Sequence, residues 1–288
     1  MITPKQTTLL LTLAIFSLTA CNNANKEPIT KNLIASVDTT TTTIKDTIIE
    51  NSVTKIDSIV YVDISFPVDS TFTTKVLTVG TFHGDEVWEN ADKGKWFGLF
   101  KNKTSYYIAE TKLKTIRVND VVVDENENEK SGWEVNTLHK DSSIILIEGL
   151  NYLNAHTIQQ AVLPKLQIFP TDTMRINYLG IDYKIFATGG SNKGADDDIP
   201  SEVWNYKLYM TATINGQQLK SLLVAQPNFE DHMINLIFAG DIDGDGILDL
   251  IIDTSRHYNA TSPTIYLSKP ADKGEVVKPI GGHTSVGC

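Results

Sequence analysis

The chain has 288 residues, with 25 basic and 35 acidic side chains, and its formal net charge is −10 at neutral pH. This acidic balance argues against nucleic-acid binding and against broad attraction to anionic lipid head groups, because both need basic surface. Residues 1–20 contain a single charged side chain, Lys5, so their removal would take the net charge from −10 to −11.

An export signal is predicted at residues 1–20. Lys5 supplies a positive charge, and the apolar stretch from Leu9 to Leu18, about ten residues, is too short to span a bilayer stably. It ends in Leu18-Thr19-Ala20-Cys21, which resembles the lipobox of bacterial lipoproteins. The resemblance implies cleavage before Cys21, lipidation of its thiol and stable anchoring by several acyl chains. An ordinary secretory signal that contains a cysteine is the alternative.

The residue after the cysteine bears on the destination of the protein. Asn22 stands where an Asp is the inner-membrane retention signal of some bacteria. We therefore expect the protein to lie in the bacterial cell envelope, as an outer-membrane lipoprotein on the periplasmic or surface face.

Residues 21–70 are predicted to form a flexible tether. Thr, Asn, Lys and Asp dominate the segment, and its two aromatic residues are Tyr61 and Phe66, so it buries too little to fold alone. Four triplets in it resemble the O-glycosylation signal of Bacteroidota, although a Thr-rich linker also produces them by chance. They are Asp38-Thr39-Thr40, Asp46-Thr47-Ile48, Asp57-Ser58-Ile59 and Asp69-Ser70-Thr71.

Residues 71–288 are predicted to form an all-β domain, either an antiparallel sandwich or partial propeller-like sheets. A division into two subdomains with a boundary near 190–200 is the alternative to a single domain. Short segments that alternate or are apolar follow one another between turns, as strands do. They are 74–82, 105–109, 115–118, 121–124, 143–148, 165–169, 173–179, 181–187, 206–214, 218–225, 234–239, 248–252 and 264–268. Helical periodicity is found only at 152–163.

For one hairpin, the sequence also predicts which side chains share a face of the sheet. Between 206 and 214, one face carries Tyr206, Leu208, Met210, Ala212 and Ile214. Asn215-Gly216 then supplies a two-residue hairpin turn, so that 218–225 returns antiparallel.

A metal-binding loop is predicted at residues 241–249. Asp241, Asp243, Asp245 and Asp249 stand at relative positions 1, 3, 5 and 9, and four carboxylates this close repel one another unless a cation lies between them. Hard oxygen ligands in a flexible loop suit Ca²⁺, and position 7, Ile247, would add its backbone carbonyl. An acidic turn without metal is the other interpretation.

The flanks exclude an EF-hand. Position 12 is Ile252 instead of a glutamate, and the segments on both sides are apolar and strand-like instead of helical. The stretch from Phe238 to Leu250 resembles the FG-GAP/VCBS repeat family, whose calcium loop of this spacing joins two strands. A single copy is present, whereas the complete propellers of that family carry several.

Other polar segments are weaker candidates. The acidic Gly-rich loop 189–198 has the residues for a metal site, and 124–130 is a charged hairpin tip; both are more often solvated loops. The six histidines are expected at the surface or at the edge of the core. His83 and His257 differ from the others in having polar neighbours in the sequence. The six are His83, His139, His156, His232, His257 and His283. Cys288 is expected to pack as a small apolar residue.

Two classes of function follow. The first is a membrane-anchored, exported calcium-binding β-domain lipoprotein with a non-enzymatic binding or structural role, its partner an unknown protein or glycan. The alternative is an exported hydrolase acting on glycans or peptides, whose site would assemble only in the fold. The C-terminal stretch also resembles uncharacterised Bacteroidota lipoproteins, a likeness that implies no activity. Its segments are 249–254, 266–268, 271–274 and 286–288.

Overall fold

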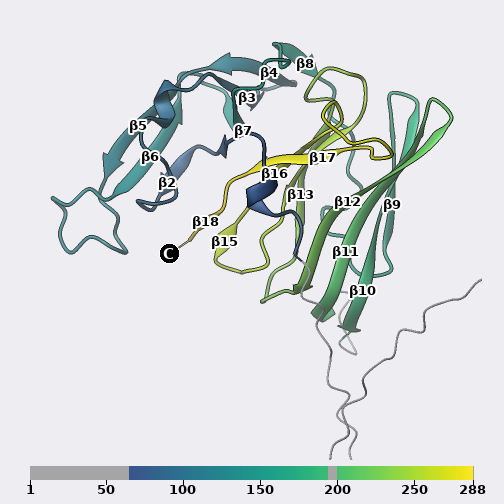
Figure 1. The fold of residues 1–288 in the computed structure, drawn as a ribbon. Coiled ribbons are helices and arrows are strands. Elements are labelled where there is room, and N and C mark those ends of the chain that lie inside the picture. The colour runs from purple at the N-terminus through teal and green to yellow at the C-terminus, as the bar shows by residue number, and fades with distance from the viewer. Residues whose placement is uncertain (1–64, 194–199, 288) are drawn as a thin grey trace, which may run out of the picture. The chain divides into compact units, whose positions relative to one another are not determined.

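The computed structural model describes residues 65–193 and 200–287 (Figure 1). Every described residue belongs to one compact unit, Asp57–Cys288. The predicted signal peptide, Cys21, the tether up to residue 64 and Cys288 lie outside the described residues. Within the described ranges, no helix has the length and hydropathy needed to cross a membrane.

The all-β prediction is confirmed. The described residues form antiparallel strands and two short 3-10 helices, η1 (Asp69–Thr71) and η2 (Ala91–Lys93), with no α-helix among them. The strands make four sheets of three or more strands and one pair, β15 (Ala260–Thr261) with β18 (Ser285–Val286).

The four larger sheets take their names from the number of their strands, from their position or from the length of their strands. The five-stranded sheet has the order β1 (Val76–Leu77), β7 (Ser142–Glu148), β3 (Trp96–Lys101), β4 (Tyr106–Thr111), β8 (His156–Ile158). The three-stranded sheet is β2 (Gly80–Phe82), β6 (Gly132–Thr137), β5 (Leu113–Val118). The central sheet is β13 (Asn235–Gly240), β14 (Asp249–Asp253), β16 (Pro263–Leu267), β17 (Lys278–Gly282). The long-strand sheet is β12 (Gln217–Asn228), β11 (Pro200–Ile214), β10 (Ile181–Lys193), β9 (Thr173–Tyr178).

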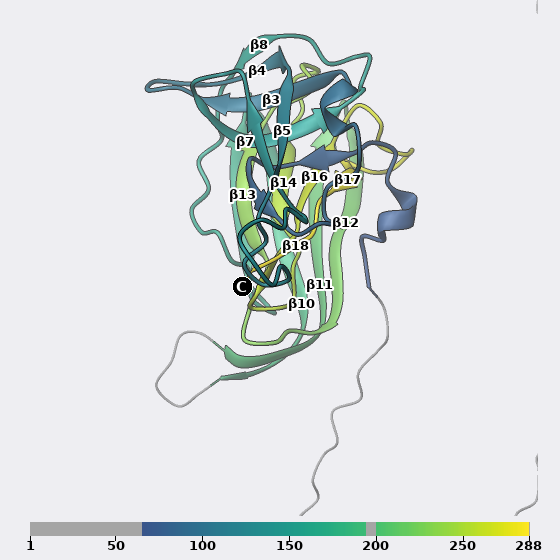
Figure 2. The same cartoon turned by 90° about the vertical axis from the view of Figure 1, so that its left-hand side faces the viewer.

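The central sheet is buried on both faces. Alternate side chains of a strand point to opposite faces, so Leu250 and Ile252 join a core shared with the long-strand sheet, and Ile251 joins a core shared with the five-stranded sheet. Figures 1 and 2 both show the central sheet beside the long-strand sheet. Every residue of β14 and β16 is buried, which explains why these strands read as continuous apolar runs.

A third core lies on the other face of the five-stranded sheet. Trp96 and Phe100 of β3 and Leu146 of β7 pack there against Trp133 and Val135 of the three-stranded sheet. The five-stranded sheet is therefore also covered on both sides.

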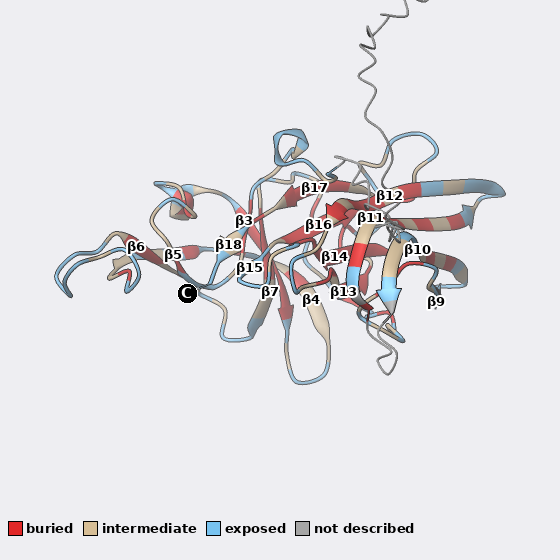
Figure 3. Ribbon diagram, turned by 90° about the horizontal axis from the view of Figure 1, so that it is seen from below, coloured by how far each residue is buried: buried red, intermediate tan, exposed pale blue. Residues whose placement is uncertain are grey.

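The long-strand sheet keeps one face exposed. Tyr206, Leu208, Met210 and Ala212 are buried as predicted, and Figure 3 shows buried and accessible positions alternating along these strands. Asn215 and Gly216 both have positive φ, 51° and 76°, as a primed hairpin turn requires, so the predicted hairpin is confirmed. Such a one-sided sheet shows the clean alternation that the sequence displays.

Several predicted elements are wrong. Residues 121–124 form a turn, because the Asp120 carboxylate accepts the Val122 N–H and holds the chain in a bend. Segment 165–169 is irregular, although Leu166 accepts a hydrogen bond from Leu236 of β13. Segment 152–163 is not helical; it contains β8 and a bridge from Gln160 to Gly240. Strands β3 and β6 were not predicted.

Two predicted domain boundaries fall where the backbone is hydrogen-bonded to a neighbouring strand. Phe66, in the last part of the expected tether, exchanges two backbone hydrogen bonds of 2.9 Å with Ala225 of β12. Within 190–200, the alternative boundary between subdomains, residues 190–193 end β10 and Pro200 begins β11, and these strands pair up to Lys193 and Pro200. Backbone pairing among the described residues thus begins at Phe66, before residue 71, and continues on β10 and β11 to both sides of 194–199.

Candidate metal centre

The acidic loop joins β13 to β14. These strands pair antiparallel, with Gly240 opposite Asp249, so the loop is the strand–loop–strand unit that the sequence predicts. Gly244 and Gly246 have φ of 76° and 86°, which glycine adopts without the strain that a Cβ would bring. The glycines let the chain fold back tightly enough for its aspartates to converge.

Three of the four aspartates come together. Asp241, Asp243 and Asp249 each offer a carboxylate oxygen, and these oxygens all lie within 4.8 Å of one another. Calcium–oxygen bonds of about 2.3–2.6 Å place ligands on opposite sides of an ion up to about 5 Å apart. The spacing of the three oxygens fits a shared calcium ion.

Asp249 is the most buried member, with no exposed surface. One carboxylate oxygen accepts the N–H groups of Ile242 (2.7 Å) and Asp243 (3.1 Å), and the other accepts that of Ser268 (2.8 Å). Burial, and then the charge of Asp243, raise the pKa of this carboxyl well above its usual range, although the three N–H groups oppose the shift. The side chain therefore organises the loop at the cost of a buried charge.

Asp243 has one carboxylate oxygen that the described protein groups leave unpaired. It is 3% exposed, its Oδ2 accepts the Lys269 N–H at 3.0 Å, and its Oδ1 is buried without a hydrogen-bond partner among the described residues. Burial, followed by the charges of Asp245 and Asp241, raises its pKa to about 6. A buried, unpaired carboxylate oxygen is unfavourable unless a cation or a proton satisfies it.

Asp241 shapes the turn and is tied to neighbouring strands. Its carboxylate accepts the N–H groups of Gly244 (2.7 Å), Asp245 (3.0 Å) and Gly246 (2.9 Å). Its own N–H donates to the Tyr178 hydroxyl at 3.0 Å. These contacts hold the carboxylate beside the other two while leaving acceptor capacity for a metal.

Asp245 and Ile247 take other positions. Asp245 is not in the group of three; its carboxylate accepts the Ile247 N–H (2.8 Å) and the Ser268 hydroxyl (2.9 Å). The Ile247 side chain packs, partly buried, against the core beneath the long-strand sheet, as expected. The ligand roles of Asp245 and of the Ile247 carbonyl stay predictions.

The sequence reasoning missed the residues that support the loop from outside. Tyr178 and Tyr183, one on each strand of the β9–β10 hairpin, accept the N–H groups of Asp241 and Leu248, at 3.0 and 3.1 Å. Ser268 and Lys269, directly after β16, supply the N–H donors to Asp249 and Asp243. For Tyr178 and Tyr183 the only signal was a position in an alternating strand, and Lys269 gave none. The pairing order of the strands, which brings these residues to the loop, is not visible in the local sequence.

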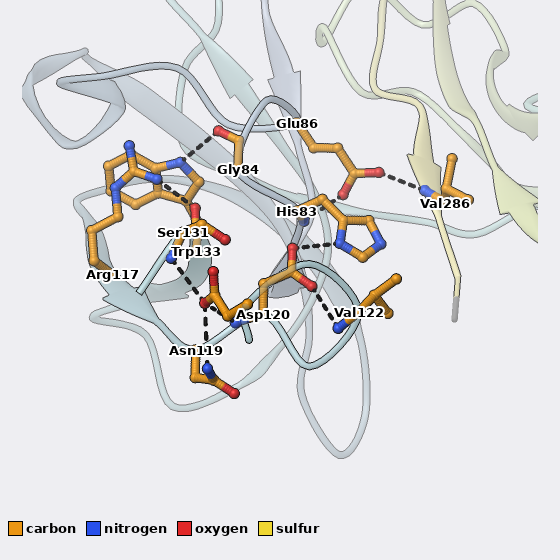
Figure 4. Close-up of polar contacts among 11 residues, drawn as sticks. His83, Gly84, Glu86, Arg117, Asn119, Asp120, Val122, Ser131, Trp133 and Val286 are labelled. Carbon is orange, nitrogen blue, oxygen red and sulfur yellow. Dashed lines mark hydrogen bonds and ion pairs between the residues drawn. The ribbon is translucent and has the colours of Figure 1, made fainter. Parts of the chain in front are cut away.

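A second polar cluster surrounds His83 (Figure 4). His83 Nδ1 lies 2.6 Å from Oδ2 of Asp120, which is 5% exposed, and the other Asp120 oxygen accepts the Val122 N–H at 3.1 Å. The hydrogen bond to Asp120 raises the pKa of His83, and the same bond lowers the pKa of Asp120. The two side chains thus satisfy each other by a hydrogen bond.

Glu86 links this cluster to the C-terminal strand β18. Its carboxylate accepts the N–H groups of His83 (2.8 Å) and Val286 (2.6 Å), and its carbonyl lies 2.9 Å from His283 Nε2. Within residues 65–193 and 200–287, no hydroxyl group is hydrogen-bonded to His83. His83 and His283 thus have defined structural contacts, as core-edge histidines do.

The two remaining sequence candidates differ: the 124–130 segment is a turn, whereas residues 189–193 of the expected Gly-rich loop belong to strand β10 and pair with β11. Asp124, at the 124–130 tip, accepts the N–H groups of Asp120 (2.8 Å) and Ser131 (3.1 Å) and so closes its own turn. In the Gly-rich loop, Gly190 lies against the Trp204 ring, and residues 194–199 are outside the description.

Comparison with known proteins adds no relative. The chain matches no family model, no curated protein and no solved structure.

Proposed function

We propose that the protein is an exported, membrane-anchored lipoprotein whose β-domain is stabilised by Ca²⁺ and has a non-enzymatic binding role at the cell envelope. The observation that carries the proposal is the unpartnered, buried Oδ1 of Asp243 beside the carboxylates of Asp241 and Asp249. Calcium would supply the missing partner and offset the repulsion within the group.

Calcium has a structural role in this proposal. Asp243 and Asp249 already accept N–H groups from Lys269 and Ser268, which follow β16, so an ion held by these carboxylates would tie the loop to a second part of the central sheet. Extracellular modules bind calcium at about 10⁻⁴–10⁻³ M, which suits permanent occupancy outside the cytosol more than signalling.

Calorimetric titration with CaCl₂ tests the site. Asp243→Asn removes one charge without changing the size of the side chain, and the exposed Asp231→Asn is the matched control. We expect calcium binding by the wild type and by Asp231→Asn, and at least a tenfold loss of affinity in Asp243→Asn. Asp245→Ala, measured alongside, determines whether that carboxylate is a ligand. No binding heat in the wild type would remove the proposal.

The anchor needs a separate test. We expect Cys21→Ser to move the protein from the membrane fraction to the soluble fraction, because the acyl chains would have no attachment point. Partitioning that does not change would refute lipidation at Cys21.

A second candidate function, an exported hydrolase, is favoured by one observation. His83 is oriented by Asp120, as the base of a catalytic pair is, and lines a cavity of about 610 Å³ together with Asp85 and Glu86. Glycan and peptide hydrolysis assays with wild type and His83→Gln test this function. Activity that His83→Gln abolishes would replace the non-enzymatic proposal.

A further inference from the structure

The exposed face of the long-strand sheet carries a row of cations. The strand register places Arg175 beside Lys184, Lys184 beside Thr211 and Thr211 beside Lys220, so one line crosses all four strands. We call this row, with the side chains on either side of it, the cationic face. Strands are about 4.8 Å apart, so Arg175 and Lys184 are adjacent and Lys220 lies about 10 Å further on.

These cations are unpaired in an acidic protein. The chain has a net charge of −10, yet within residues 65–193 and 200–287 no carboxylate forms an ion pair with Arg175, Lys184 or Lys220. The one carboxylate beside the row, Asp182, accepts a hydrogen bond from Asn177 at 2.7 Å. The positive charge of this face is therefore available to an anion from outside.

Two aromatic rings border the row on one side. Phe186 and Tyr209 face each other across β10 and β11, with ring centroids 5.4 Å apart and an interplanar angle of 25°. Lys184 Nζ lies 4.6 Å from the Phe186 centroid, and Lys220 Nζ lies 4.1 Å from that of Tyr209. The rings hold both ammonium groups in place, which reduces the entropy lost on binding.

Uncharged hydrogen-bonding groups border the row on the other side. Asn177, Thr213 and Gln218 are exposed there and, with the cations, line an open depression of about 870 Å³. Amides and hydroxyls both donate and accept, so they suit the hydroxyl groups of a sugar. The face thus combines cations, aromatic rings and polar groups in parallel rows, and the polar row includes one carboxylate, Asp182, which is hydrogen-bonded to Asn177.

We propose that the cationic face binds an acidic polysaccharide that crosses the strands. Its carboxylate or sulfate groups pair with Arg175, Lys184 and Lys220, and its hydroxyls bond the neighbouring amides and hydroxyls. Three cations spread over four strands match a polymer with a low density of charge, whereas the net charge of −10 repels a densely charged one such as a nucleic acid. The inference rests on the proposed binding role, for which it names the ligand class, and does not involve the aspartate loop.

Calorimetric titration of the full-length chain in detergent tests the proposal. The probes are hyaluronate and chondroitin sulfate, with dextran as the neutral polymer and polyglutamate and single-stranded DNA as other polyanions. We expect both acidic polysaccharides to bind, dextran not to bind, and affinity to fall as NaCl rises from about 50 to 200 mM, because exposed charges are screened. Absence of binding by both polysaccharides, or tighter binding of polyglutamate or DNA, would overturn the proposal.

A triple variant localises the binding. Each exposed ion pair contributes up to about 1 kcal/mol, so removing three cations in Arg175→Gln, Lys184→Gln, Lys220→Gln is expected to weaken binding roughly 30- to 100-fold. The control removes the same charge elsewhere, from the exposed Lys103, Lys112 and Lys114, and is expected to change affinity less than twofold. Equal losses in the two variants would refute the assignment to this face.

Calcium titration of the same preparations distinguishes the calcium proposal from the polysaccharide proposal. It also shows whether each variant is folded. A triple variant that binds calcium like the wild type is folded, so its loss of polysaccharide binding belongs to the face. Calcium binding without polysaccharide binding overturns this inference alone. Polysaccharide binding without calcium binding overturns the calcium proposal alone.

Discussion

Asp120 and Asp243 are both almost fully buried, at 5% and 3% exposure, yet their pKa values move in opposite directions. Asp120 has a hydrogen-bond partner, His83, and this bond is the largest cause of its lowered pKa. Asp243 has carboxylates as neighbours and one oxygen without a partner, and its pKa is raised to about 6. Burial alone therefore does not identify a functional carboxylate; the identity of its neighbours does.

The comparison also separates two uses of a polar cluster. Around His83, each carboxylate oxygen of Asp120 and Glu86 has a donor from the protein itself, so the cluster is complete as it stands. At the aspartate loop, backbone N–H groups satisfy most oxygens, but within residues 65–193 and 200–287 no side-chain cation pairs with the group of three. If calcium binds there as proposed, the two clusters should respond differently to substitution and to metal.

The largest expected effect is a pH dependence of the metal-stripped protein. A carboxyl whose pKa is about 6 when folded and 3.8 when unfolded binds more protons in the folded state between these values. The free energy of unfolding should thus fall by about 3 kcal/mol in total as pH rises from below 3 to above 7, with about 2 kcal/mol of this fall between pH 4 and 6. Urea denaturation of wild type and Asp243→Asn over this range isolates the contribution, which should be absent from the variant. A wild-type profile parallel to that of the variant would contradict it.

Calcium is expected to raise stability by a similar amount at neutral pH. An ion that binds only the folded state contributes about 2.7 kcal/mol at 100 times its Kd, or roughly 5–11 °C in melting temperature for a domain of this size. Differential scanning calorimetry with CaCl₂ and with MgCl₂ measures the shift. Equal shifts for both ions would contradict a calcium-selective site.

The effect of Asp243→Asn on the free energy of unfolding should change sign when calcium is added. In metal-free buffer at pH 7, the amide removes a buried charge and is expected to stabilise the protein by about 1–2 kcal/mol. With saturating calcium, the variant should be less stable than wild type, because it has lost a ligand. Denaturation curves of both proteins in both buffers should therefore cross, and curves that keep one order in both buffers would argue against a ligand role.

Asp120→Asn makes the same chemical change in the cluster of His83, Asp120 and Glu86. It should lower the stability of the protein both with and without calcium. The substitution removes the charge that favours protonated His83, and no repulsion is relieved in return. We expect the melting temperature to fall by several degrees, independently of calcium. A rise in melting temperature would show that the two aspartates do not differ as described.

The smallest effect is expected at the rim of the completed cluster. Glu89 is exposed and pairs with Arg117, which is also held by stacking 3.6 Å from the Trp133 ring and by a hydrogen bond to the Ser131 carbonyl. Glu89→Gln should change the free energy of unfolding by less than about 0.5 kcal/mol. A larger loss in chemical denaturation would mean that the ion pair matters more than its exposure indicates.

Sequence reasoning predicted strands best where one face is exposed. The alternation from Tyr206 to Ala212 was visible, because the sheet has water on its other side. Strand β3, Trp96-Phe97-Gly98-Leu99-Phe100-Lys101, was missed, since it lies between two cores and shows no alternation. The three valines at 121–123 suggested a strand, yet they are 81%, 58% and 63% exposed in a turn set by Asp120.

At the aspartate loop, the local part was predictable and the distant part was not. The spacing of Asp241, Asp243 and Asp249 and the glycines between them point to convergence, and the structure brings these three together. That Asp245 would bond Ser268, or that Tyr178 and Tyr183 would hold the two ends of the loop, depends on which sheets pack together. Residues 23 to 65 positions away in sequence take part, and no local pattern encodes that separation.

The burial of the central sheet on both faces has a consequence for the order of folding. Ribosomes make the chain from its N-terminus, so the five-stranded and long-strand sheets are complete before β13, which begins at Asn235, exists. Each of them has an apolar face that packs against the central sheet. These two faces must therefore stay uncovered by the central sheet until the last fifth of the chain arrives, so folding is governed by long-range pairing and the nascent domain is exposed to aggregation.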